Sequence, residues 1–188
     1  ERYQVRGIPA VKLFIDGGVA DEFTGALPQS ALEAWLAQRI PTAAGQQLAA
    51  GRAALARGDR IAARAGLEAS LAAEPDSRDA RGLLALAVVL DDPARAAALA
   101  EGIREDCASF SAASAARELA SLLTLDVDDL PAGRGQAPFR AGLEALRGGD
   151  VNAAFTHFLD CVIDDRGYRD DAARRACVAL LELIGAEH

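Results

Sequence analysis

Two stretches of the sequence match each other without a gap, and this internal repeat constrains the fold more than any other feature. The first begins at Gly51 as GRAALARGDRIAARAGL, and the second begins at Gly142 as GLEALRGGDVNAAFTHF. The matches include Gly51/Gly142, Ala54/Ala145, Leu55/Leu146, Gly58/Gly149, Asp59/Asp150 and Ala63/Ala154. Large apolar residues, Leu67 and Phe158, share a further position, and Arg78-Asp79 aligns with Arg169-Asp170. The sequence therefore predicts two copies of one helical unit.

The repeated residue types indicate a pair of antiparallel helices. A glycine within the first helix (Gly51, Gly142) lets a partner helix approach closely. The Gly-Asp pair ends that helix, because glycine adopts the left-handed turn and aspartate accepts hydrogen bonds from the free amides of the next helix. We expect Ala63 and Ala154 to lie where the two helices touch, with the large apolar residue of each copy filling the space above.

On these residues the chain resembles the tetratricopeptide repeat, a helix-turn-helix unit of about 34 residues. The first unit has the typical small, apolar and proline residues at Gly51, Gly58, Ala63, Leu67 and Pro75. The last unit retains Gly142, Gly149, Ala154 and Phe158, whereas Arg166 stands in place of the proline. The middle stretch, Arg78 to Leu125, is helical and degenerate, and Asp92-Pro93 breaks it early. The alternative interpretation is a generic alanine-rich helical bundle.

From Thr42 onward the sequence has no strand signal. Breaks between helices fall at Gly58-Asp59, Pro75-Asp76, Asp91-Asp92-Pro93, Gly148-Gly149-Asp150 and, as a longer acidic loop, Asp126 to Pro138. Repeat arrays build a concave surface that holds peptides or proteins. The candidates for lining it are Leu48, Arg52, Leu55, Phe139, Leu143 and Leu146, although core positions would show the same pattern. The last helix, Asp171 to Ile184, should cap the array with Ala173, Cys177, Leu180, Leu181 and Ile184 inward.

The first forty residues have a different pattern, which indicates strands as well as a helix. Val11 to Ile15 and Val19 to Thr24 are short strands, and the Asp16-Gly17-Gly18 between them is typical of a tight hairpin turn. A helix then follows Leu27-Pro28, with Leu32, Trp35, Leu36 and Ile40 on one face and Pro41 at its end. We therefore place a domain boundary between residues 41 and 42, with the helical domain at 42–188.

This opening segment is similar to the C-terminal half of thioredoxin over Tyr3 to Ile40. RGIPAVKLFIDGG matches that fold's proline loop, strand and hairpin turn. The resemblance implies a cis bond before Pro9, although a trans proline remains open on the sequence, and a loop of Gly7, Ile8 and Pro9 whose backbone binds an extended peptide. The strands, helices and CxxC pair of the first half of that fold are not in this sequence, so we expect no dithiol chemistry from this chain alone.

A thioredoxin domain followed by degenerate tetratricopeptide repeats resembles the chaperedoxins, or YbbN-type thioredoxin-like proteins. This resemblance implies a bacterial, cytoplasmic holdase that binds unfolding client proteins and passes them to the chaperonin. It also implies chaperonin contact by the last helix, for which the candidates are Val178, Leu181, Glu182 and Ile184. The alternative is a thiol-disulfide oxidoreductase whose repeats select substrates, so enzymatic activity stays open. A scaffold for one fixed partner is a third possibility.

Composition and charge argue against several classes of protein function. A net charge of −8 argues against nucleic acid, which needs a basic face, and no apolar run is long enough to span a bilayer. Cys107, Cys161 and Cys177 lie among small and apolar residues without CxxC spacing, which indicates buried structural thiols in a reducing compartment. We find no motif for a cofactor, metal, nucleotide or phosphate.

Half of a sheet should be unstable by itself, because some forty residues bury too little surface. We expect the chain to be a piece of a longer protein. The opening segment should then pack on the repeats, pair its free strand edge with a second copy as a homodimer, or pair with residues outside this sequence.

Overall fold

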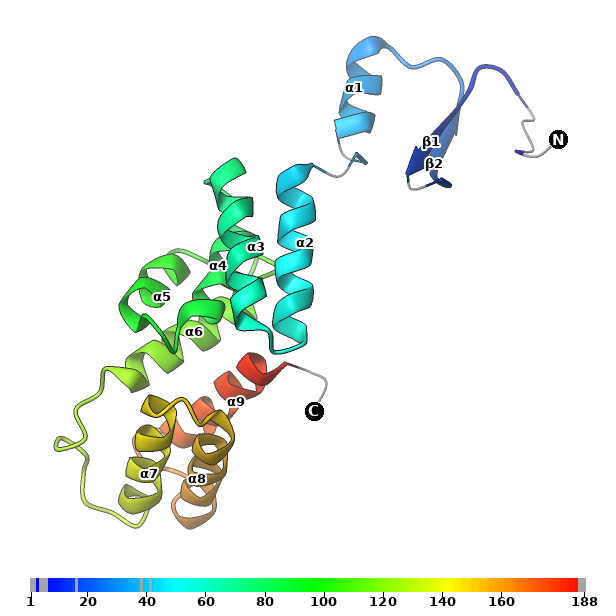
Figure 1. Cartoon of the computed structure of the whole chain (residues 1–188). Helices are drawn as coiled ribbons and strands as arrows, with labels where there is room; N and C mark the ends of the chain where they lie inside the picture. The colour runs from blue at the N-terminus through cyan, green and yellow to red at the C-terminus, as the bar shows by residue number, and fades with distance from the viewer. Residues whose placement is uncertain (1–2, 4–6, 16, 38, 41, 186–188) are drawn as a thin grey trace. The chain divides into compact units, whose positions relative to one another are not determined.

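The computed structural model describes residues 3, 7–15, 17–37, 39–40 and 42–185. The chain divides into two compact units, Glu1–Thr42 and Ala43–His188, a boundary one residue from that suggested by the sequence. The first unit carries two strands and one helix, and the described part of the second consists of helices joined by turns and loops (Figure 1). The expected architecture, mostly α with a hairpin in front, is confirmed.

The first unit is an antiparallel hairpin of β1 (Ala10–Ile15) and β2 (Gly18–Thr24), followed by α1 (Gln29–Ala37). Gly17 has a φ of +82°, the left-handed conformation that the tight turn requires. The register shifts between Leu13 and Phe14, so that Leu13 pairs with Asp21 and Phe14 with Val19. Within the described residues the sheet has these two strands, and the outer edge of β1 pairs with no other described strand.

Helix α1 and the residues after it contact the hairpin through one aromatic pair and one ion pair. The rings of Phe23 and Trp35 meet edge to face, with centroids 5.0 Å apart, and the guanidinium of Arg39 lies 5.1 Å from the Trp35 ring while pairing with Asp21. Ile40, expected on the inner face, is half exposed because α1 ends at Ala37. Pro41, expected to close the helix, lies outside the described residues, as does Asp16 of the turn.

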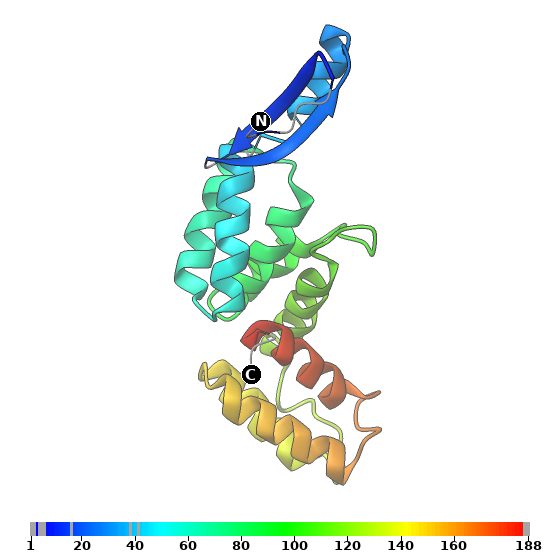
Figure 2. The ribbon, with the colours of Figure 1, turned by 90° about the vertical axis from the view of Figure 1, so that its right-hand side faces the viewer.

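The second unit is a stack of helices. They are α2 (Ala43–Ala56), α3 (Arg60–Ala73), α4 (Arg78–Val88), α5 (Pro93–Ala100), α6 (Phe110–Leu123), α7 (Gln136–Arg147), α8 (Val151–Asp164) and α9 (Ala172–Ile184). Helices α2 to α6 each pack on the next in sequence, and α4 also packs on α6. The last three depart from sequence order: α9 lies between α6 and α8, and α7 packs on the far side of α8 (Figure 2). The core runs through the stack.

The hairpin of α2 and α3 confirms the predicted role of its small residues. A Cβ placed on Gly51 would lie 2.6 Å from the Leu67 Cγ, so only glycine lets α3 come this close. Leu67 and Ala63 have no exposed surface. Gly58 ends α2 with a φ of +73°, and the Asp59 carboxylate accepts a hydrogen bond of 3.0 Å from the Ala62 amide at the start of α3.

The hairpin of α7 and α8 repeats this construction. A Cβ on Gly142 would lie 2.8 Å from Cδ1 of the buried Phe158 ring. Gly149 has a φ of +78°, and Asp150 accepts a hydrogen bond of 2.9 Å from the Ala153 amide. The two halves of the sequence repeat are therefore two copies of one structural unit.

The repeat stops matching beyond the hairpins. Arg78 is the first residue of α4, which Ser77 caps, whereas Arg169, Asp170 and Asp171 all have left-handed backbones with φ of 49°, 55° and 64°. The aligned Arg-Asp pairs thus have different conformations. Before this turn the buried Tyr168 donates a hydrogen bond of 2.7 Å to the Pro131 carbonyl and packs against Phe139, which fixes the chain there.

The long acidic loop is shorter than expected, because α7 begins at Gln136 rather than after Pro138. Proline fits the first turn of a helix, where its missing amide has no partner to lose.

The close glycine contact predicts a stability effect that opposes helix propensity. Alanine is intrinsically better than glycine inside a helix by about 1 kcal/mol. Gly51→Ala and Gly142→Ala should nevertheless each lower the free energy of unfolding, by about 1–3 kcal/mol, because the methyl group overlaps a packed side chain. Urea denaturation followed by circular dichroism measures this change.

Gly148→Ala is the matched control, since a Cβ there meets nothing closer than backbone oxygens at 3.4 Å. If Gly51→Ala were as stable as this control, the glycine would not set the distance between the helices.

Candidate protein-binding surface

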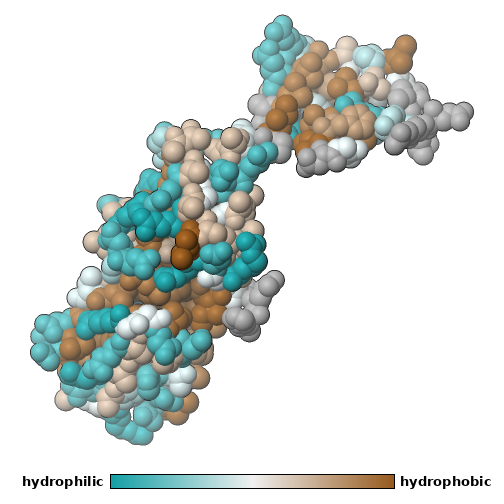
Figure 3. All heavy atoms as spheres, viewed as in Figure 1, coloured by the Kyte–Doolittle hydropathy of each residue, from teal (hydrophilic) through white to brown (hydrophobic). Residues whose placement is uncertain are grey.

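A groove of about 350 Å³ lies between α6 and α9 and is the best candidate site in the repeat unit. Its lining comes from both helices and comprises Phe110, Ser111, Ser114, Ala115, Glu118, Arg174, Arg175, Val178, Ala179 and Glu182. Figure 3 shows apolar surface gathered across the middle of this unit, at the level where Figure 1 places α6 and α9.

Small residues on α6 create the groove. Ala112, Ala113 and Ala116 are buried and let the neighbouring helices come close, while Phe110 and Ala115 reach the groove from the same helix. On α9, Val178 is 59% exposed and Leu181 is 52% exposed. Exposed apolar side chains beside a hollow gain free energy when a partner side chain displaces the water over them.

Charged side chains around the groove are paired within the molecule. Arg175 lies 3.3 Å from Glu118 and Arg174 lies 3.3 Å from Asp171, while the Ser111 hydroxyl donates a hydrogen bond of 2.8 Å to Glu182. Exposed pairs of this kind contribute little to stability. They form a polar rim, which leaves the apolar centre to receive a partner.

The structure places the predicted partner-binding residues of the last helix in different environments. Val178 and Glu182 line the groove, Leu181 is exposed on the same helix, and Ile184 is half-buried. Ala173, Cys177 and Leu180 point inward as expected. Leu181 does not, and Leu183 occupies the core in its place, because the buried stripe continues from Leu180 by three residues rather than by one.

The prediction that the first helix of each repeat lines a partner-binding groove is wrong for most of its residues. Leu55, Phe139, Leu143 and Leu146 are buried in the core and present no surface to a partner. The cause is the close approach of the paired helices, which draws the apolar stripes of α2 and α7 inside. Leu48 is half-buried against the same core, and Arg52 is exposed.

The predicted peptide-binding loop lies in the first unit, directly before β1. The Ile8–Pro9 peptide bond is cis, as expected, and the Pro9 carbonyl accepts a hydrogen bond of 2.8 Å from the Gly25 amide. Ile8 is 92% exposed, whereas Gly7 lies close to Thr24, with 3.2 Å from a Cβ at Gly7 to the threonine methyl. Peptide binding by this loop stays a prediction.

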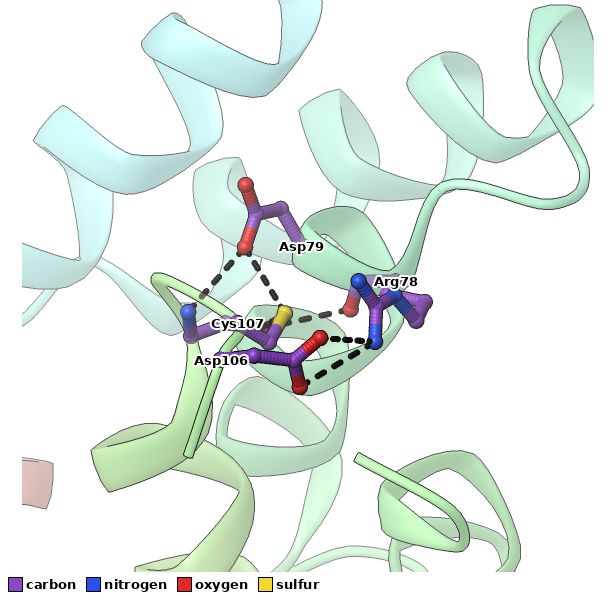
Figure 4. A network of polar contacts seen from close by, with 5 residues as sticks. Arg78, Asp79, Asp106 and Cys107 are labelled. Atoms are coloured by element: carbon purple, nitrogen blue, oxygen red, sulfur yellow. Dashed lines mark hydrogen bonds and ion pairs between the residues drawn. The ribbon is translucent and has the colours of Figure 1, made fainter. Parts of the chain in front are cut away.

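A polar network holds the segment that leads into α6 and its groove. One Asp79 oxygen accepts hydrogen bonds from the Ser109 amide at 3.0 Å and from the Cys107 thiol at 3.1 Å (Figure 4). The Ser109 hydroxyl donates to the Arg78 carbonyl at 3.3 Å, and Arg78 pairs with Asp106 at 3.0 Å. Because Phe110 and Ser111 follow immediately, this network fixes one end of the groove.

The pKa of Asp79 reflects this network. Partial burial raises the pKa, but the hydrogen bonds from Cys107 and Ser109 and the charge of Arg52 outweigh it and hold the pKa below its ordinary 3.8. Asp79 also lies in the first turn of α4, where the helix dipole favours a carboxylate.

The buried thiols are poor nucleophiles. Burial raises the pKa of Cys161 to about 11, and its Sγ donates to the Gly135 carbonyl at 3.3 Å. Burial also raises the pKa of Cys177. Since the thiolate is the reactive form, both cysteines act as packing residues. Among the residues that the structure describes, no cluster of three or more histidine, cysteine or acidic side chains could hold a metal ion.

Sequence reasoning missed the contribution of α6 to the candidate site. Phe110, Ala115 and Glu118 meet α9 across more than fifty residues of sequence, and no local pattern reports that pairing. The spacing of Phe110, Ser114 and Glu118 at every fourth residue does place them on one face of a helix.

The tetratricopeptide repeat family matches residues 111–188, which run from the second residue of α6 through α9 and include every groove-lining residue except Phe110. No curated protein matches the sequence. None of the described helices combines the length and apolar character needed to cross a bilayer. The second unit is therefore a helical array in which residues 111–188 match the tetratricopeptide repeat family, and repeat arrays of this kind generally mediate protein–protein interaction.

Removing the Asp79 carboxylate should loosen this array in a pH-dependent way. Its folded pKa lies below the unfolded value, so its stabilisation is present above about pH 4 and is lost as the pH falls through the folded pKa. Asp79→Asn should lower the free energy of unfolding by about 1 kcal/mol at pH 7 and by less at pH 3. Urea titrations at both pH values measure the two differences.

Asp129→Asn, in an exposed part of the loop before α7, should change neither value. An equal loss at pH 3 and pH 7 for Asp79→Asn would contradict the role of its charge.

Proposed function

We propose that this chain is the client-binding part of a holdase co-chaperone, and that the apolar groove between α6 and α9 is where clients bind. The observation that carries the proposal is the exposure of Val178 and Leu181 on α9, with Val178 lining a hollow of about 350 Å³. An unfolding protein exposes apolar side chains, and such a hollow can bury one of them without a specific sequence match.

The charge of the chain supports a holding role. A net charge of −8 keeps the protein and its bound clients dispersed through repulsion, and the paired rim of the groove limits non-specific ionic capture. Phe110, Ala115, Val178 and Ala179 supply the apolar part of the groove lining, which suits clients of varied sequence.

The remaining parts of the proposal concern partners. We propose the chaperonin as the acceptor of clients, with Leu181, Glu182 and Ile184 of α9 in the contact, in the cytoplasm. The first unit would be the second half of a thioredoxin-like domain. Its strand β1 supports this, because Val11 and Leu13 lie on one face and Phe14 on the other, as in a strand covered on both sides. Its free edge would pair with the rest of that domain or with a second copy.

The oxidoreductase alternative has less support from this chain. The pKa values of Cys161 and Cys177 are raised by burial, which disfavours the thiolate that disulfide exchange needs. The reactive pair would have to come from sequence outside this chain.

Suppression of client aggregation tests the holding role. The full chain, in several-fold molar excess, should reduce the light scattering of a thermally unfolding client such as citrate synthase. Val178→Asp/Leu181→Asp should lose most of this effect, because two charges on the exposed face of α9 oppose burial of an apolar client side chain.

Ile61→Asp is the matched control, since Ile61 is 86% exposed on α3, away from the groove lining. Circular dichroism should show that all variants keep wild-type helix content. No suppression by the wild-type chain would refute the holdase proposal. Equal suppression by the double variant would refute this groove as the site.

A further inference from the structure

Helix α8 carries large apolar side chains beyond the face that packs in the core. Its inner residues Ala154, Phe158 and Cys161 are buried against α7 and α9. On its outer side Leu159 is 44% exposed and Ile163 is 74% exposed. A surface helix normally presents polar residues to water on its outer side, so two large apolar side chains exposed one turn apart are a departure from that pattern.

The first helical hairpin provides an internal comparison. Helix α3 occupies the same place between α2 and α4 that α8 occupies between α7 and α9. At the positions of Leu159 and Ile163 it carries Glu68 and Ala72. Glu68 pairs with Arg64 and Arg95 on the surface. Packing of the first hairpin therefore does not require large apolar side chains at these two positions. Leu159 and Ile163 of α8 need an explanation other than packing within the array.

Acidic side chains flank the exposed apolar pair. Asp160 and Asp164 follow Leu159 and Ile163 directly, are exposed, and form no ion pair with any residue that the structure describes. Leu159, Asp160, Ile163 and Asp164 together are here named the α8 strip. Because each residue type recurs at every fourth position, the strip has an apolar ridge about 6 Å long beside a parallel acidic row.

We propose that the α8 strip docks a helical segment of a partner protein whose apolar ridge is flanked by lysine or arginine. Leucine or isoleucine side chains of the partner would pack against Leu159 and Ile163, as ridges do between helices. Its basic side chains would pair with Asp160 and Asp164, which gives the strip a preference for basic segments.

The charge of the strip argues against other occupants. In a two-fold dimer through α8, Asp160 and Asp164 would face the same residues of the second copy, so like charges would meet at the interface. Phosphate-bearing surfaces, whether nucleic acid or anionic membrane, would be repelled by the same row. The strip does not share residues with the α6–α9 groove, so this inference is independent of the proposed function.

A designed peptide tests the strip directly. The probe is a fluorescein-labelled amphipathic helix of leucine and lysine, with leucine at every third or fourth position, titrated with the full chain by fluorescence anisotropy. We expect saturable binding that weakens with salt, and no binding of the same peptide with glutamate in place of lysine. Leu159→Ser/Ile163→Ser should weaken binding about tenfold, and Asp160→Asn/Asp164→Asn several-fold with a smaller salt dependence.

Two controls separate docking from general attraction to an acidic protein. Glu101→Gln/Glu105→Gln removes the same charge from an exposed segment elsewhere, and Ile61→Ser removes an exposed apolar side chain from α3; both should leave the affinity unchanged. All substituted side chains are surface-exposed, so wild-type circular dichroism is expected. Equal weakening by the controls, unchanged affinity in the α8 variants, or absence of binding would each overturn the proposal. So would a dimer, seen by sedimentation, that Ile163→Ser dissociates.

Discussion

The repeat unit depends on the close approach of two helices at a glycine. At Gly51 and Gly142 the first helix of each hairpin lacks a side chain where the second inserts Leu67 or Phe158. This contact sets the distance between the helices, and it explains why the apolar stripes of α2 and α7 turn inward. The Gly-Asp turn that follows then fixes the angle at which the second helix leaves, because one residue adopts a left-handed backbone and the next caps the new helix. Each hairpin is thus specified within a short stretch of sequence.

The packing order of the last helices determines which residues form the surface of the array. Helix α9 packs between α6 and α8 instead of following the hairpin outward, so it has one neighbour from each part of the array. Its exposed large apolar residues, Val178 and Leu181, lie on the part of the helix that these neighbours leave uncovered. The groove between α6 and α9 and the α8 strip are both candidates for protein contact, because neither is required to close the core.

Local features were predictable from the sequence, and long-range ones were not. The hairpins, their caps and the opening β-hairpin follow from glycine, aspartate and apolar spacing within some thirty residues. Leu55, Phe139, Leu143 and Leu146 were correctly placed on apolar stripes, but a stripe does not reveal whether it faces a partner helix or a ligand. Phe110 and Val178 line one groove because the chain folds back after the loop before α7, and no local periodicity in the sequence indicates this. Likewise, the left-handed turn at Arg169 to Asp171 contains no glycine, so no residue type in the sequence indicated a positive φ there.

That turn has a mechanical consequence. Three successive non-glycine residues in the left-handed region raise the free energy of the folded chain by about 1–2 kcal/mol each, with aspartate at the lower end. The packing of α9 against its neighbours must offset this backbone cost. The net free energy that keeps α9 docked is therefore smaller than its buried surface suggests. Release of α9 would relieve the backbone of these residues, so the cost of the left-handed turn favours local opening of the array at this helix.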